Sequence, residues 1–240
     1  MGVLTQQHIE RVHHYAPLHY LPFIGRSKSL LCKPSLLAAG FAQDHLRSMS
    51  REHDVERGFG AYTHLTLEPR PRILKAKLAA GFPHIGVAVP ADCVEAVSFS
   101  LCRFNVAMTR HLRRNGQPGF PESSTNGRYY DQHQIPIARS DADKTAMLEK
   151  HLPANTMIEV LVHGDLVLPD RTEIGCFSDA DAKIAQQVLS EVGAPWNVTS
   201  IASPGPYPRN AKHVEAITTF IDQALAELDW RGNGLEFDRL

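Results

Sequence analysis

The chain has 240 residues, 43% of them hydrophobic, and a formal net charge of -1, so it can bury a sizeable core but carries no uniformly basic coat. Any contact with nucleic acid must therefore come from a local patch. No apolar run approaches about 18 residues, and no basic region followed by an apolar core opens the chain, so we expect a cytoplasmic protein with no membrane partner. The 4 cysteines form no C-x-x-C pair and the 13 histidines no H-E-x-x-H motif, so we expect neither a disulfide framework nor a metal.

The N-terminal quarter predicts two strands separated by a short helix and a polar segment. Residues 11–16 are typical of a strand, and residues 18–24 of a short helix that Gly25 ends. Residues 42–60 are rich in charge and poor in core residues, which is typical of a functional or disordered loop. Residues 62–67 are aromatic and β-branched and predict a strand.

The middle of the chain predicts helices and strands, followed by the longest loop. A helix is expected over 72–80, strands over 84–89 and 97–102, and a helix over 106–115. Residues 116–140 are dense in Gly, Pro, Ser and Asn and predict a loop.

The remaining residues predict further alternating elements. We expect helices over 142–152, 179–192 and 210–228, and strands over 157–164, 172–177 and 196–201. Ser178 would cap the second of these helices and Gly193 would end it. The pattern is α+β, with few βαβ units. Since G-x-G-x-x-G, the P-loop and G-x-S-x-G are all absent, a dinucleotide would not bind by the Rossmann route.

The strand at 157–164, M-I-E-V-L-V-H-G, holds one carboxylate among apolar residues. Because side chains alternate along a strand, its branched residues at 158, 160 and 162 point into a core while Glu159 points the other way. Such a strand can hold a carboxylate rigidly at the floor of a cleft, where it stabilises a developing positive charge. The alternative is an edge strand whose Glu159 faces solvent.

Four segments carry a resemblance to a known family. They are H-Y-A-P-L-H-Y-L-P-F-I at 14–24, G-A-Y-T-H-L-T-L-E-P-R-P-R-I-L at 60–74, the segment 85–107, and I-E-V-L-V at 158–162. In the same order and with similar spacing, they resemble H-I-T-H-x-x-N-L-x-x-I-L, G-D-Y-V-P-F-Y-F-x-P-R-S-P-M-L, a strand-turn-strand followed by T-D-G-N/H-A, and A-E-F/V-L-V. These motifs belong to the DarT family of toxins, which transfer ADP-ribose from NAD to a base in DNA.

The resemblance covers roughly residues 12–177 and implies an architecture. It implies an α+β fold with an ADP-ribosyltransferase-like split mixed β-sheet core, flanking helices and a long substrate loop. We expect a single domain over residues 1–240, in which residues 178–240 form an additional strand and helices that do not match the family pattern. By the same resemblance, residues 42–60 would close over NAD and residues 116–157 would meet the target.

The resemblance also implies a site. Glu159 would be the catalytic glutamate, hydrogen-bonded to the ribose whose bond to nicotinamide breaks through an oxocarbenium-like state. Arg70 would approach the NAD phosphates and help activate the target base; the alternative is a solvated arginine at a strand end. NAD, consumed as a co-substrate, would be held by His14, Tyr15, Ala16, Leu31 and Arg70. Without the resemblance, a lone strand histidine such as His14 is more often a satisfied core residue.

A second set of residues would bind the substrate. It comprises Arg113, Arg128, Tyr129, Tyr130 and His133. The two tyrosines could stack on an unpaired base beside the arginine that precedes them, or could belong to an ordinary loop. Arg113, with Arg110 and Arg114 on the predicted helix, could track phosphates, or could form a solvated face.

Two departures from the family pattern bear on the substrate. Ala16 replaces the family threonine, and Arg103, Phe104 and Asn105 replace T-D-G, which puts the DNA substrate in doubt. We therefore expect a mono-ADP-ribosyltransferase that modifies a base in single-stranded DNA or RNA, as a toxin or phage-defence effector with an antitoxin partner. The alternatives are the same fold acting on a protein or small molecule, and a catalytically silent binding module.

Overall fold

The computed structural model describes the chain in several stretches. They are residues 2–39, 58–69, 71–79, 81, 83–103, 106, 112–114, 117–118, 127–129, 137–153, 158–201, 219 and 221. The helices are α1 Val3–Gln6, α2 Leu21–Ser27, α3 Lys33–Ala38, α5 Arg72–Ala79, α6 Ala91–Glu95, α7 Asp141–His151 and α8 Asp179–Glu191, with a 3-10 helix, η1, at Leu18–Tyr20.

The strands lie between these helices, in places several in succession. They are β1 Arg11–Pro17, β2 Ser29–Leu30, β3 Tyr62–Thr66, β4 His84–Pro90, β5 Phe99–Cys102, β6 Leu112–Arg114, β7 Gln117–Pro118, β8 Gly127–Tyr129, β9 Ile137–Ala138, β10 Glu159–His163, β11 Leu166–Val167, β12 Glu173–Cys176 and β13 Asn197–Ser200. The α+β prediction is therefore confirmed.

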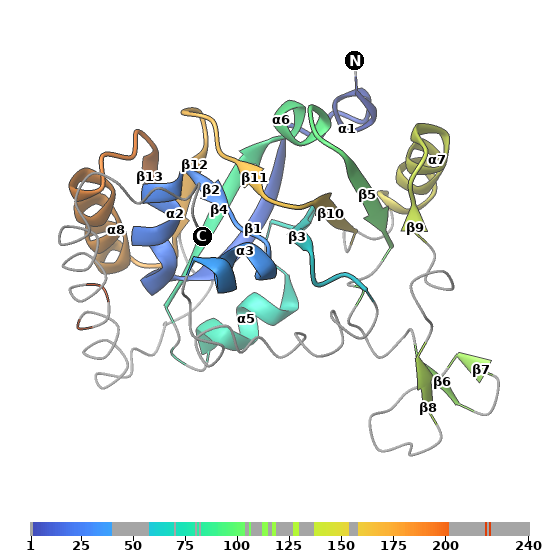
Figure 1. The fold of residues 1–240 in the computed structure, drawn as a ribbon, viewed down its shortest axis with the longest axis horizontal. Coiled ribbons are helices and arrows are strands. Elements are labelled where there is room, and N and C mark those ends of the chain that lie inside the picture. Colours follow the sequence, from blue (N-terminus) through green and yellow to red (C-terminus); the bar gives the residue numbers. More distant parts are fainter. Residues whose placement is uncertain are drawn as a thin grey trace.

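One eight-stranded sheet organises the fold, in the order β13-β12-β4-β1-β3-β10-β5-β9. It is mixed, because β12 and β13 run parallel while its other neighbours run antiparallel. It is also split: β1 pairs with β4 along its whole length but meets β3 through the single pair His13↔Thr66. Figure 1 shows α2 and α8 at one end of this sheet and α7 with β9 at the other. The predicted split mixed sheet is confirmed.

The central position of β10 decides between the two hypotheses for Glu159, a buried carboxylate and a solvent-facing one on an edge strand. β10 lies between β3 and β5, and Val160 and Val162 pack into the main core while Leu161 joins a second cluster on the opposite face with Phe59. Glu159 is 5% exposed. The alternative of an edge strand with a solvent-facing glutamate is therefore wrong.

Helix α2 does not end at Gly25, contrary to the prediction. The helix continues to Ser27, and Lys28, with φ of 49°, takes the left-handed conformation that ends it. Gly25 serves packing instead: a Cβ added there would lie 2.6 Å from Cγ2 of Val192, at the end of α8. Its missing side chain lets α2 approach α8 closely.

The predicted helix over 106–115 is wrong at residues 112–114. These residues form β6, which pairs with both β7 and β8 in a three-stranded sheet. The expected loop 116–140 accordingly contains β7, β8 and β9. The sequence between β6 and β7 is Asn-Gly, which favours a two-residue hairpin loop. This turn signal outweighs the helical spacing of Arg110, Arg113 and Arg114 on which the helix prediction depended.

Other helix ends agree with their predicted caps. Ser178 Oγ accepts a hydrogen bond from the Asp181 amide at 3.1 Å at the start of α8, and Gly193 follows this helix with φ of 68°. Most of the predicted helix 210–228 lies outside the described residues. Within this range the structure describes residues 219 and 221, and both are helical. Among the helices that the structure describes, none is long and apolar enough to cross a membrane.

Candidate active site

Glu159 opens β10, and both of its carboxylate oxygens are held. Oε1 lies 3.0 Å from Nδ1 of His64 on the neighbouring β3, and Oε2 accepts a hydrogen bond from the Val106 amide at 2.7 Å. The residues directly opposite Glu159 in the sheet are Thr66 on β3 and Cys102 on β5. The carboxylate is thus buried and oriented by a side chain and a backbone donor.

His64 connects this carboxylate to His14. His64 Nε2 lies 3.0 Å from the Phe59 carbonyl oxygen, and the His64 carbonyl accepts a hydrogen bond from Nδ1 of His14 at 2.8 Å. This last contact lies where β1 and β3 separate, beyond their single ladder pair. His14 and Glu159 are therefore linked by two hydrogen bonds through one residue.

The protonation of His14 follows from these contacts. Burial lowers the pKa of His14 below its ordinary value of 6.5, so the imidazole is neutral at neutral pH. A carbonyl oxygen only accepts, so Nδ1 carries the proton and Nε2 offers a lone pair. No other residue in the described part of the chain hydrogen-bonds to this imidazole. His14 thus keeps one acceptor for a ligand.

A pocket opens beside His14. It is lined by His14, Ala16, Tyr20, Phe23, Ile24, Ser27, Ser29, Leu30, Leu31 and Leu36. Three of the residues predicted to bind NAD, from β1 and from the segment before α3, therefore share one largely apolar pocket. Glu159 is outside this lining, on the face of the sheet that carries Phe59 and Val106.

Tyr15 lies apart from the other predicted cofactor residues. Its side chain projects to the opposite side of β1, where it packs near Phe177 with ring centroids 6.4 Å apart. Its hydroxyl donates to the Pro69 carbonyl. This bond anchors the backbone next to Arg70, which itself lies outside the described residues.

The predicted substrate residues fall on the small three-stranded sheet or beyond it. Arg113 of β6 pairs directly with Arg128 of β8, and Leu112 with Tyr129. Figure 1 shows this sheet below β9, away from the eight-stranded sheet. Tyr130 and His133 lie outside the described residues.

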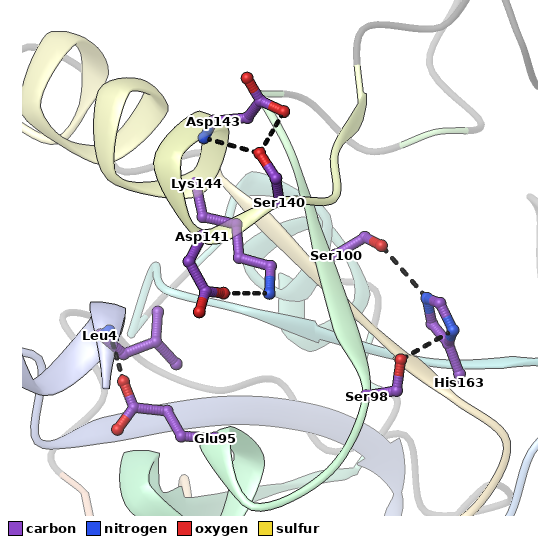
Figure 2. Close-up of polar contacts among 9 residues, drawn as sticks. All are labelled: Leu4, Glu95, Ser98, Ser100, Ser140, Asp141, Asp143, Lys144 and His163. Atoms are coloured by element: carbon purple, nitrogen blue, oxygen red, sulfur yellow. Dashed lines mark hydrogen bonds and ion pairs between the residues drawn. The ribbon is translucent and has the colours of Figure 1, made fainter. Parts of the chain in front are cut away.

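The far end of β10 is fixed by a different histidine. Nδ1 and Nε2 of His163 lie 3.1 Å from the hydroxyl oxygens of Ser98 and Ser100, respectively, and Figure 2 shows the ring between these two serines. Burial, with nearby Arg139 and Lys144, lowers the pKa of His163. These contacts tie β10 to β5, so the strand that presents Glu159 is held at both ends.

Metal-binding side chains are not clustered in the described part of the chain. Within the residues that the structure describes, no group of three or more His, Cys, Asp or Glu side chains is placed to hold an ion. All 4 cysteines are free thiols. Within the described residues, the candidate site brings together the Glu159 carboxylate, His64 and His14, with an apolar pocket beside His14.

The split mixed sheet, with a buried glutamate opening a central strand, is part of a fold that the chain shares with DarT structures. The chain is similar to solved structures of DarT from Thermus sp. 2.9. The complex with NAD+ has 13% sequence identity and a TM-score of 0.52, over 79% of this chain and 94% of that chain. The complex with ADP-ribosylated ssDNA has 12% identity and a TM-score of 0.54, over 82% and 95%. No protein-family model and no curated protein sequence matches the chain.

His64 is a candidate-site residue that the sequence did not identify. It lies in the T-H-L-T stretch of a correctly predicted strand, but its partner Glu159 is 95 residues away. Only the pairing of β3 with β10 brings the two together. The β10 prediction contained the signal for a partner, since a buried carboxylate requires a donor, but it did not identify the donor.

Proposed function

We propose that this protein is an NAD-dependent mono-ADP-ribosyltransferase that modifies a base in single-stranded nucleic acid. The observation that carries the proposal is the carboxylate of Glu159, which is buried and held by His64 and the Val106 amide. It occupies a fold shared with a protein solved in complex with NAD+. A fixed carboxylate in a water-poor place is what a developing positive charge on ribose requires.

The reaction is a substitution at the anomeric carbon of the NAD ribose. The bond between this carbon and the nicotinamide nitrogen breaks, and its electron pair leaves with nicotinamide. A nitrogen of the target base forms the new bond, and the proton that this nitrogen carried is released to solvent. Glu159 stabilises the oxocarbenium-like state between these events, and an interaction stronger in that state than in bound NAD accelerates the step.

The pocket beside His14 suits part of the NAD molecule. Its walls of Phe23, Ile24 and Leu30 are apolar, which fits a flat aromatic ring, and binding pockets typically combine such walls with few polar groups. The free Nε2 of His14 would accept a hydrogen bond from a ribose hydroxyl. Ala16 and Leu31 would complete the wall. Tyr15, on the opposite side of β1, would act indirectly by anchoring the backbone before Arg70 through the Pro69 carbonyl, and Arg70 would approach the phosphates.

A single-stranded nucleic acid is the proposed acceptor. A structure of the similar Thermus DarT contains ADP-ribosylated ssDNA, and modifying an unpaired base avoids the few kcal/mol needed to extrude a base from a duplex. In the small sheet, Arg113 and Arg128 are paired, next to Tyr129. Together with Tyr130 and His133, these residues would supply local charge and stacking surfaces.

The test is a transfer assay with NAD labelled in its ADP-ribose part. The protein is incubated with separate pools of single-stranded DNA, RNA and protein, and E159Q is the control. Label in a nucleic-acid pool that E159Q does not produce supports the proposal. Label in the protein pool alone favours a protein target, and no label in any pool and no release of nicotinamide favours a silent binding module.

A toxin role is a separate part of the proposal. Modified bases would block the use of the nucleic acid as a template, so induced expression of the wild-type chain should stop growth of a bacterial host. Expression of E159Q to the same level should not. Such a toxin would require a partner antitoxin protein, and growth arrest by both proteins alike would count against the role.

A further inference from the structure

His64 joins three parts of the chain. Its Nδ1 contacts Glu159 at 3.0 Å, its Nε2 contacts the Phe59 carbonyl at 3.0 Å, and its own carbonyl accepts from His14 at 2.8 Å. Its side chain is 20% exposed, against 6% for that of Glu159. The imidazole of His64 therefore lies between the Glu159 carboxylate and the carbonyl of Phe59, which precedes β3 in the chain.

The donors and acceptors of this group are constrained by chemistry. The Phe59 carbonyl only accepts, so Nε2 of His64 carries a proton. When Glu159 is ionised, Nδ1 must also carry a proton, and the contact is a charge-assisted hydrogen bond. The Val106 amide can only donate to the other oxygen. The carboxylate therefore has a donor on each side and cannot rotate without losing one.

We propose that His64 is a positioning residue, which holds the Glu159 carboxylate in its reactive orientation and couples that orientation to Phe59 and His14. This inference rests on the proposed function, because it assigns to Glu159 the stabilisation of the ribose. Catalytic groups must stay close to the productive geometry, and a misplacement of about 1 Å can reduce turnover by about 100-fold. His64 itself need not touch either substrate.

Two variants separate the side-chain contacts of His64. His64→Asn places an amide nitrogen near the position of Nδ1, so it keeps a donor for Glu159 and loses the contact with Phe59. His64→Gln places an amide nitrogen near the position of Nε2, so it keeps a donor for the Phe59 carbonyl and loses the contact with Glu159. Both remain polar and similar in size, so they share any effect of replacing the imidazole in β3. His64→Leu removes both contacts.

The kinetic test compares kcat and KM for NAD in these variants. If His64 positions Glu159, His64→Gln and His64→Leu should lower kcat by roughly 10- to 100-fold, and His64→Asn should recover most of the loss. The KM for NAD should change little in each. Equal kcat values for His64→Asn and His64→Gln would overturn the proposal, as would a wild-type kcat in His64→Gln. If His64→Leu does not fold, the comparison of the other two still decides.

A second measurement does not depend on transferase activity. The carboxyl resonance of Glu159, recorded by NMR on protein with labelled glutamate, is assigned by its loss in E159Q. It should shift strongly in His64→Gln and weakly in His64→Asn. An unchanged resonance in His64→Gln would overturn the positioning role. A wild-type protein without activity but with this pattern of shifts would contradict the proposed function and leave the positioning of the carboxylate supported.

Discussion

His64 on β3 and Glu159 on β10 are diagonal neighbours in the sheet, and their Nδ1 and Oε1 atoms lie 3.0 Å apart. Diagonal neighbours on one face of a sheet are within reach of long side chains. The contact joins the two strands on the face that also carries Leu161 and Phe59. The placement of the carboxylate therefore depends on the pairing of β3 with β10.

His14 should contribute to NAD binding through its free Nε2. His14→Asn keeps a donor for the His64 carbonyl but lacks an acceptor at the Nε2 position, so NAD should bind about 3- to 10-fold more weakly, the range expected for one hydrogen bond. Isothermal titration calorimetry on the E159Q background would measure this without turnover. His13→Asn, on the opposite side of β1, is the matched control and should bind NAD normally. Equal affinities of the His14 and His13 variants for NAD would contradict a contribution of His14 to NAD binding.

The free energy of unfolding should fall as the pH decreases through the range of histidine titration. Burial lowers the pKa of His14 in the folded chain below 6.5, and burial also lowers the pKa of His13 and of His163. The unfolded chain therefore binds more protons below about pH 6.5, which favours unfolding. Urea titrations at about pH 7.5 and about pH 5.5 would show the loss, and His14→Asn should show a smaller one. A loss of the same size in that variant would contradict the contribution of His14.

Gly25 should be required for the close approach of α2 and α8. Gly25→Ala places a Cβ 2.6 Å from Cγ2 of Val192, and such overpacking typically costs about 1–3 kcal/mol. Because α2 lines the pocket with Phe23 and Ile24, NAD binding should weaken as well. Thermal unfolding and NAD titration would measure both effects.

The double variant Gly25→Ala with Val192→Ala tests the cause of this effect. Removing Cγ2 of Val192 removes the clash, so the double variant should be more stable than the sum of the two single changes implies. Additive losses would mean that the contact does not explain the cost.

The tyrosines at 129 and 130 should matter for the nucleic acid and not for NAD. Replacing both with Ala should reduce modification of single strands and leave slow NAD hydrolysis nearly unchanged, because stacking on an unpaired base is worth about 1–3 kcal/mol per base. Arg113→Ala should weaken binding modestly and lower the salt slope by about one unit. Equal or faster modification of fully paired DNA, or wild-type transfer by the double-tyrosine variant, would defeat this prediction.

Periodicity and caps in the sequence were enough to predict much of the fold. The alternation around Glu159 identified a strand with two different faces, and Ser178 and Gly193 marked the ends of α8, because these signals are local. Gly25 was misread as a helix end, since its reason for being glycine is the contact with Val192, far away in the chain. The pairing of β3 with β10, and hence the role of His64, is likewise non-local.

Glu159 is proposed to support the transfer of ADP-ribose to an unpaired base. The most direct measurement is mass spectrometry of a single-stranded oligonucleotide after incubation with NAD and either the wild-type chain or E159Q. Gln keeps the size of the side chain and removes its charge, and loss of one electrostatic stabiliser typically costs about 100- to 1000-fold. We expect one added ADP-ribosyl group with the wild type and almost none with E159Q, with NAD binding retained by E159Q. An adduct formed equally by both proteins would contradict this role of Glu159.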